Sequence, residues 1–267
     1  MGPNLYKTSR SETVRVIAIA RNTFREALRD KALYVLIVFS VVLVVSTRIM
    51  SPLALGEGVK ITKDVGLSAI SFFGMLAIIV MGTGLVHKEI DRRTIFVILS
   101  KPVSRYEFIL GKFLGMADAL IAIVLLMLVT LQITLLISTA GFDVPVLKAG
   151  FLTYIELLLM TSIAVLFSSF STTGLSAIFT FSFYAVGHFT GDILAFAARL
   201  PSPFAQHVCQ FVYYLLPDLQ LFNVRGMVVH GIDVPTEHLL AATAYGLLYT
   251  LGALLLSAVV FSRRDFK

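Results

Sequence analysis

Four long apolar stretches with almost no charge constrain the fold of this chain more than any other feature. They run over Val65–His87, Ala119–Phe142, Leu157–Ala198, which contains the single charge of Asp192, and Leu239–Ser262. Each reaches the roughly 20 residues that a helix needs to cross a hydrocarbon core of about 30 Å. Over the whole chain, 57% of residues are hydrophobic and 14% are charged, which is more apolar side chain than a soluble fold of this size can bury. We therefore expect an all-α polytopic membrane protein.

The apolar pattern predicts six transmembrane helices within a domain covering residues 32–262. The third stretch is long enough to cross twice, because the polar sequence SSFSTTG at 168–174 offers the Ser, Thr and Gly that favour a turn. A single long tilted helix over this stretch is the alternative. Arg48, near the end of the first span, can extend its charge towards the interface. The predicted spans are 32–51, 65–87, 116–140, 150–170, 174–198 and 239–262.

Basic residues predict the orientation. The N-terminal segment, residues 1–31, is polar and basic and lacks the early apolar core of a signal peptide. With this segment inside, the inner loops and the tail at 263–267 hold sixteen of the 22 Lys and Arg residues. The positive-inside rule then predicts that both termini lie in the cytoplasm, with the chain in the inner membrane of a prokaryote.

Two regions are expected to lie outside the spans. Residues 199–237 are apolar but broken by prolines, and they fit a cap on the outer surface or a shallow re-entrant helix, with Gly226 and Gly231 forcing turns. Thr13–Lys31 is amphipathic at helical spacing and is expected to lie along the cytoplasmic membrane surface. Its predicted apolar face consists of Val16, Ile17, Ala20, Phe24, Ala27 and Leu28.

The densest charge lies between the second and third spans, where residues 88–112 read KEIDRRTIFVILSKPVSRYEFILGK. Pro102 disfavours helix at the residue before it. Ser104 followed by Glu107 is the pattern of a capping box at the start of a helix. The passage therefore predicts a helical hairpin in the cytoplasm, over residues 88–115. It is either a docking surface for a soluble partner or a loop whose charge only fixes the topology.

This passage resembles the signature of ATP-binding-cassette type-2 permeases: an acidic and basic segment ending in Thr, a Leu/Ile run, a turn with Pro, and an apolar stretch closed by Gly-Lys. The closest similarity is to permeases with separate ATPase subunits, such as the nitrous-oxide-reductase maturation permease. An Arg92–Arg93 pair stands where the family commonly has a small residue. The resemblance implies that the passage is a coupling helix seated in a cleft of the ATPase. The residues to which it assigns this contact are Glu89, Arg92, Arg93, Thr94, Leu99, Lys101, Pro102, Arg105, Tyr106 and Lys112.

The resemblance also implies the partners: two copies of an ATPase subunit, and a second permease chain that is identical or related. The chain has no G-x-x-x-x-G-K-[ST] motif, so ATP and Mg²⁺ are expected on the ATPase, with no cofactor bound directly. The chain is thus expected not to be an enzyme by itself. The importer-type EAA pattern is also missing, which favours an exporter-like or mechanical subunit.

Ionisable residues inside the spans are candidates for substrate binding, since charge at membrane depth is costly. Glu156 lies in the fourth span, and His188 and Asp192 are four residues apart and so are expected on one face of the fifth. This pair could form an interhelical hydrogen bond, contact a substrate or contribute to a metal site. A metal would need further ligands, for which only His207 and Cys209 are distant candidates, so no metal site is predicted.

The favoured function is the transmembrane permease subunit of an ATP-driven exporter that works by alternating access. A secondary transporter or channel is an alternative, but it predicts inverted internal repeats, and the sequence has no convincing repeat. A membrane anchor that positions a partner without transport is the other alternative.

Overall fold

The computed structural model describes residues 4–50, 57–82, 104–138, 141–197, 199–200 and 202–263, and each regular element within these ranges is a helix. The all-α prediction is therefore confirmed for this part of the chain. Residues 88–103 of the predicted coupling hairpin lie outside the described residues, which resume at Ser104.

Four helices are long and apolar enough to cross a membrane: α3 (Gly58–Gly82), α6 (Arg105–Ile137), α7 (Val144–Phe170) and α12 (Thr236–Ser262). They correspond to the spans predicted at 65–87, 116–140, 150–170 and 239–262. Helix α7 is the centre of the bundle and packs against α3, α6, α8 and α12. Its apolar residues are buried almost all round, as expected of a helix surrounded by other helices.

Two shorter apolar helices accompany these four: α2 (Lys31–Met50) and α8 (Thr173–Gly187). Helix α2 coincides with the first span, predicted at 32–51. Its side chains Val35, Phe39 and Val42 are exposed on the outside of the bundle. The turn predicted at 168–174 is confirmed, because α7 ends at Phe170 and α8 begins at Thr173. The alternative of one long helix is therefore excluded.

The prediction of a continuous fifth span over 174–198 is wrong. Helix α8 has 15 residues, which is about 22 Å of helix, and a separate helix α9 (Thr190–Ala197) follows. The segment after Pro217 packs against the break: a Cβ on Gly187 would meet Leu219 Cδ1 at 2.8 Å, and Thr190 donates a hydrogen bond of 2.8 Å to Asp218. These contacts come from residues about 30 positions away, which local sequence patterns do not reveal.

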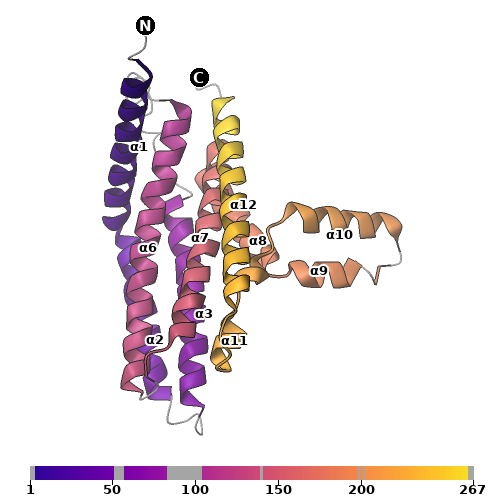
Figure 1. The fold of residues 1–267 in the computed structure, drawn as a ribbon. Helices are drawn as coiled ribbons and strands as arrows, with labels where there is room; N and C mark the ends of the chain where they lie inside the picture. Colours follow the sequence, from indigo (N-terminus) through magenta and orange to yellow (C-terminus); the bar gives the residue numbers. More distant parts are fainter. Residues whose placement is uncertain are drawn as a thin grey trace.

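The region predicted as a cap, 199–237, contains α10 (Pro203–Leu215), the 3₁₀ helix η2 (Leu219–Phe222) and α11 (Arg225–Val229). Helices α9 and α10 form a hairpin that projects sideways from the bundle (Figure 1). In contrast, α11 packs on α3 and α7. Gly231 adopts φ 73° and makes the predicted turn. The turn predicted at Gly226 is wrong, because this residue lies within α11.

Helix α1 (Asn4–Leu28) packs along α6. Ala20, Thr23 and Ala27 are buried on its inner face, whereas Ile17 and Leu28, predicted on the apolar face, are exposed. Both ends of the chain lie at one end of the bundle, next to the start of α6 (Figure 1). We call this the termini end, formed by α1, the start of α6 and the end of α12.

Candidate functional site

The start of α6, directly after the charged passage, is a junction between three helices. Ser104 caps α6: its hydroxyl accepts a hydrogen bond from the Glu107 N–H at 3.3 Å, and Glu107 Oε2 accepts one from the Ser104 N–H at 2.8 Å. The predicted capping box is therefore confirmed. The other carboxylate oxygen of Glu107 lies 2.7 Å from Arg15 Nη2 on α1. One glutamate thus fixes the start of α6 and its attachment to α1.

Arg105 joins the same turn to the last turn of α12. Its Nη1 donates hydrogen bonds to the carbonyl oxygens of Phe261 at 2.9 Å and Ser262 at 2.8 Å. The last carbonyls of a helix have no partner within the helix and carry its partial negative charge. A guanidinium at this position is therefore favourable for both hydrogen bonding and electrostatics. The rings of Phe108 and Phe261 stack beside this contact, with centroids 5.7 Å apart.

Two glycines allow α1 to lie close against α6. A Cβ on Gly111 would meet Ile19 Cβ at 2.7 Å, and a Cβ on Gly115 would meet the Ala20 carbonyl oxygen and Thr23 Cβ. Between them, the Lys112 side chain is 2% exposed, with Nζ 3.8 Å from Glu26 of α1 and 5.8 Å from the centroid of the Phe108 ring. Small residues four apart commonly permit such close helix contacts.

Of the predicted ATPase-contacting residues, the structure describes only those that follow Ser104. Glu89, Arg92, Arg93, Thr94, Leu99, Lys101 and Pro102 lie outside the described residues. Of the others, Tyr106 is 48% exposed, whereas Arg105 and Lys112 engage α12 and α1. The role of these residues at the ATPase stays a prediction.

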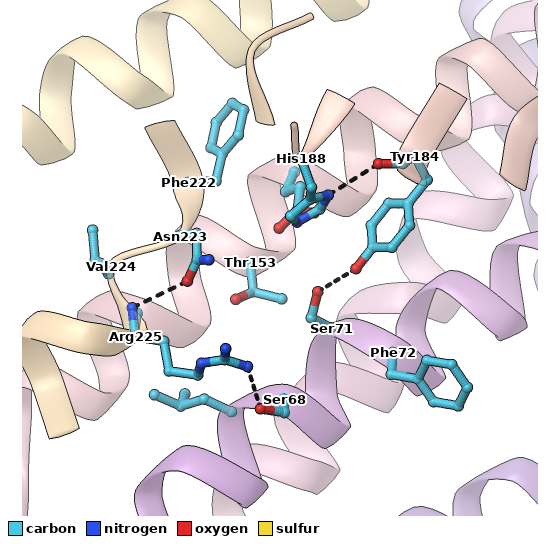
Figure 2. Close-up of a pocket in the computed structure, with 13 residues that line it drawn as sticks. Ser68, Ser71, Phe72, Thr153, Tyr184, His188, Phe222, Asn223, Val224 and Arg225 are labelled. Atoms are coloured by element: carbon cyan, nitrogen blue, oxygen red, sulfur yellow. Dashed lines mark hydrogen bonds and ion pairs between the residues drawn. The ribbon is translucent and has the colours of Figure 1, made fainter. Parts of the chain in front are cut away.

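A second site is a polar pocket of about 290 Å³ between α3, α7, the end of α8 and the segment joining η2 to α11 (Figure 2). Its polar lining includes Ser68 and Ser71 of α3, Thr153 and Glu156 of α7, Tyr184 and His188 of α8, and Asn223 and Arg225 after η2. Leu67, Phe72, Ala149, Phe222 and Val224 complete the wall. Hydroxyl, carboxylate, imidazole and guanidinium groups thus converge within the membrane-spanning bundle.

Glu156 and His188 lie together at this pocket. Glu156 is 2% exposed and lies about three turns into α7, and its Oε1 is 3.3 Å from His188 Nε2. The two atoms do not have hydrogen-bond geometry, and Glu156 Oε1 has no hydrogen-bond partner among the described residues. His188 Nδ1 lies 3.0 Å from the Tyr184 carbonyl oxygen. The structure therefore brings together two of the predicted substrate-site residues.

Asp192 does not share a helix face with His188 as predicted. His188 is the C-terminal cap of α8, whereas Asp192 belongs to α9. His207 and Cys209, the distant metal candidates, belong to α10 in the projecting hairpin. Within the described ranges, no group of three His, Cys, Asp or Glu side chains could hold a metal ion.

The sequence prediction missed the rest of the pocket. Ser71 and Tyr184 share a hydroxyl hydrogen bond of 2.7 Å, and Arg225 donates to Ser68 (Figure 2). Arg225 also forms a 3.0 Å ion pair with Asp64. Only Arg225 gave a sequence signal, since it is a charged residue in an apolar region. Its partners on α3 lie more than 150 positions away and have no local signature.

The comparison with protein families gives a match over nearly the whole chain: residues 17–266 match the model of the ABC-2 family transporter protein. The chain belongs to this ABC-2 transporter family. A search of curated proteins gave no match. The match includes the start of α6, the end of α12 and the lining of the polar pocket, and it begins two residues after Arg15.

Membership explains the setting of both sites. ABC-2 permeases are membrane components of ABC transporters, and they work with a partner ATPase subunit. The several apolar helices and the family together indicate a multi-pass membrane protein. In this ABC-2 permease, the junction directly follows in sequence the segment predicted to meet the ATPase, whereas the pocket lies between α3, α7 and the end of α8.

Proposed function

We propose that this chain is the permease subunit of an ATP-driven exporter in which a separate ATPase drives alternating access. The contact of Arg105 with the end of α12 carries the proposal. The ATPase would press on residues 88–103, and α6 begins only two residues later. Because this turn is held to α1 by Glu107 and to α12 by Arg105, its displacement would move three helices together.

The proposed assembly has two permease chains, identical or related, above two ATPase subunits that bind ATP and Mg²⁺. The proposed permease has six spans, with α2 and α8 as the two shorter ones, so that both termini would lie on the same side, the cytoplasmic side of a prokaryotic inner membrane. Helix α1 would brace the start of α6 at that surface. The resemblance of the charged passage favours the subgroup with separate ATPase chains. The basic residues at 92, 93 and 105 support this orientation.

Co-purification tests the proposal. The full-length permease is produced with a candidate partner ATPase, and the ATPase is expected to co-purify. The double reversal Arg92→Glu and Arg93→Glu should abolish this association, while Arg199→Glu, a charge reversal in the connection between α9 and α10, should leave it intact. An ATPase that binds the double variant normally would contradict the coupling role. Transport by the permease alone, driven by an ion gradient, would instead support a secondary transporter.

A further inference from the structure

The pairing of Glu156 with His188 is chemically incomplete. The Tyr184 carbonyl can only accept, so His188 Nδ1, 3.0 Å away, carries the hydrogen of this contact. In a neutral imidazole Nε2 is then an acceptor, and it lies 3.3 Å from Glu156 Oε1. An ionised carboxylate is also an acceptor only. With the imidazole neutral and the carboxylate ionised, two acceptors therefore lie next to each other without a donor between them, and burial makes such an unsatisfied pair costly.

One nitrogen donor in the pocket would satisfy both atoms. Acceptors 3.3 Å apart are both within reach of a single ammonium nitrogen, at about 2.8 Å from each, which is the length of a charge-assisted hydrogen bond. An ammonium group also supplies the positive charge that a buried carboxylate lacks. The nearby hydroxyls of Ser71, Tyr184 and Thr153 can bind further polar groups of the same ligand.

The other charges around the pocket do not oppose the binding of an ammonium group. Arg225 is the cation of the lining, and it is already neutralised by Asp64 at 3.0 Å. Its guanidinium also donates to Ser68. Glu156 therefore remains the acid of the described lining, with His188 rather than a Lys or Arg beside it. The volume of about 290 Å³ equals that of roughly ten water molecules and suits a small ligand.

We propose that this pocket binds a small ligand bearing an ammonium group, whose nitrogen is held jointly by Glu156 and His188. That the ligand is the transported substrate rests on the function proposed above; the binding itself does not. Glu156 supplies the charge, His188 supplies the second acceptor, and the hydroxyls of α3 and α8 hold the rest of the molecule.

The single cysteine of the chain, Cys209, makes a direct test possible. The variant Cys209→Ser with Thr153→Cys carries its only thiol in the pocket, three residues before Glu156. Two thiosulfonate reagents of similar size are compared, one with an aminoethyl group and one with a sulfonatoethyl group. In each case the thiolate attacks the thiosulfonate sulfur, forms a mixed disulfide and releases methanesulfinate. The reference is wild-type Cys209 on α10, outside the pocket.

The ratio of the aminoethyl to the sulfonatoethyl labelling rate is measured at the pocket thiol and divided by the same ratio measured at Cys209. This normalised ratio should be about ten, the effect of one modest charge interaction. Adding Glu156→Gln should reduce this preference to near one, while the control Glu237→Gln, in the exposed first turn of α12, should preserve it. Methylammonium should slow the labelling more than sodium at equal ionic strength. This competition tests the site even if Glu156→Gln fails to fold.

Equal normalised rates for the two reagents would overturn the proposal, as would a preference that survives Glu156→Gln in a folded protein. Equal protection by methylammonium and sodium would overturn it too. The labelling uses the full-length permease without an ATPase, so a negative result leaves the coupling proposal standing. Conversely, failure of the ATPase to co-purify would not alter the labelling rates.

Discussion

Glu107 forms a 2.7 Å ion pair with Arg15, and this contact ties the capped start of α6 to α1 across 92 positions of sequence. The same carboxylate closes the capping box with Ser104. The buried glutamate therefore has two structural tasks in one turn. A shift of α6 along α1 at this point would break the capping box or the ion pair with Arg15.

Glu107→Ala should destabilise the permease more than Ser104→Ala does. Loss of a capping residue costs about 1 kcal/mol, and Glu107→Ala also leaves Arg15 without its carboxylate. Thermal unfolding of the purified full-length chain measures both variants. Glu237→Gln, an exposed acid in the first turn of α12, is the control and should unfold near the wild-type temperature. Equal effects of Glu107→Ala and Ser104→Ala would mean that the ion pair contributes nothing measurable.

Arg105→Met tests whether the α6–α12 contact transmits movement without binding the ATPase. Since Arg105 donates to the last carbonyls of α12, we expect co-purification of the ATPase to persist while ATP-driven transport falls several-fold. Arg93→Glu, in the charged passage, should reduce both. If Arg105→Met abolishes co-purification as well, Arg105 contacts the ATPase directly, as the sequence resemblance alone implied.

Local patterns predicted one half of this junction and missed the other. The capping box of Ser104 and Glu107 could be predicted from the sequence because it is formed by residues three positions apart. The contact of Arg105 with Phe261 and Ser262 joins positions 156 and 157 apart, and both acceptors are backbone atoms that have no sequence signature. The long helices were predictable from apolar length, whereas the break after Gly187 lies where η2, from a distant part of the sequence, packs against the end of α8.

The glycines of α6 offer a test of the α1 contact. Gly115→Ala should lower stability by about 1–3 kcal/mol, the cost of overpacking a close contact, because the added methyl group would meet backbone and Thr23 of α1. The matched control is Gly252→Ala in α12, where a Cβ meets nothing within 4 Å. There the higher helix propensity of alanine should leave stability unchanged or raised. Similar losses for both variants would contradict the close packing.

Lys148 and Asp233 predict a pH-dependent contact between α7 and the segment before α12. Lys148 Nζ lies 2.7 Å and 2.8 Å from the two carboxylate oxygens, and this hydrogen bonding holds the pKa of Asp233 below its ordinary value of 3.8. A lowered pKa means that the stabilisation is present above pH 3.8 and disappears as the pH falls through the folded-state value.

Asp233→Asn should therefore unfold at a lower temperature than wild type at pH 6, by a small margin that salt reduces, because the pair is exposed. The two unfolding temperatures should converge as the pH falls below 3.8. A difference that persists at the lowest pH would show that the charge of Asp233 is not its cause.

Lys63 and Asp143 form a nearly buried ion pair between α3 and the N-terminal cap of α7, with side chains 11% and 13% exposed. Gln132 of α6 reinforces it by donating to the Asp143 carbonyl at 2.7 Å. Removing one partner of a buried pair leaves an uncompensated charge, which costs about 3–5 kcal/mol. Lys63→Met should therefore be strongly destabilising in thermal unfolding, and adding Asp143→Asn should recover much of the loss, because asparagine keeps a cap for α7 without the charge. Additive losses in the double variant would contradict direct pairing. Recovery would establish that this contact, between residues 80 positions apart, fixes α3 against α7 on the side of the pocket away from the termini end.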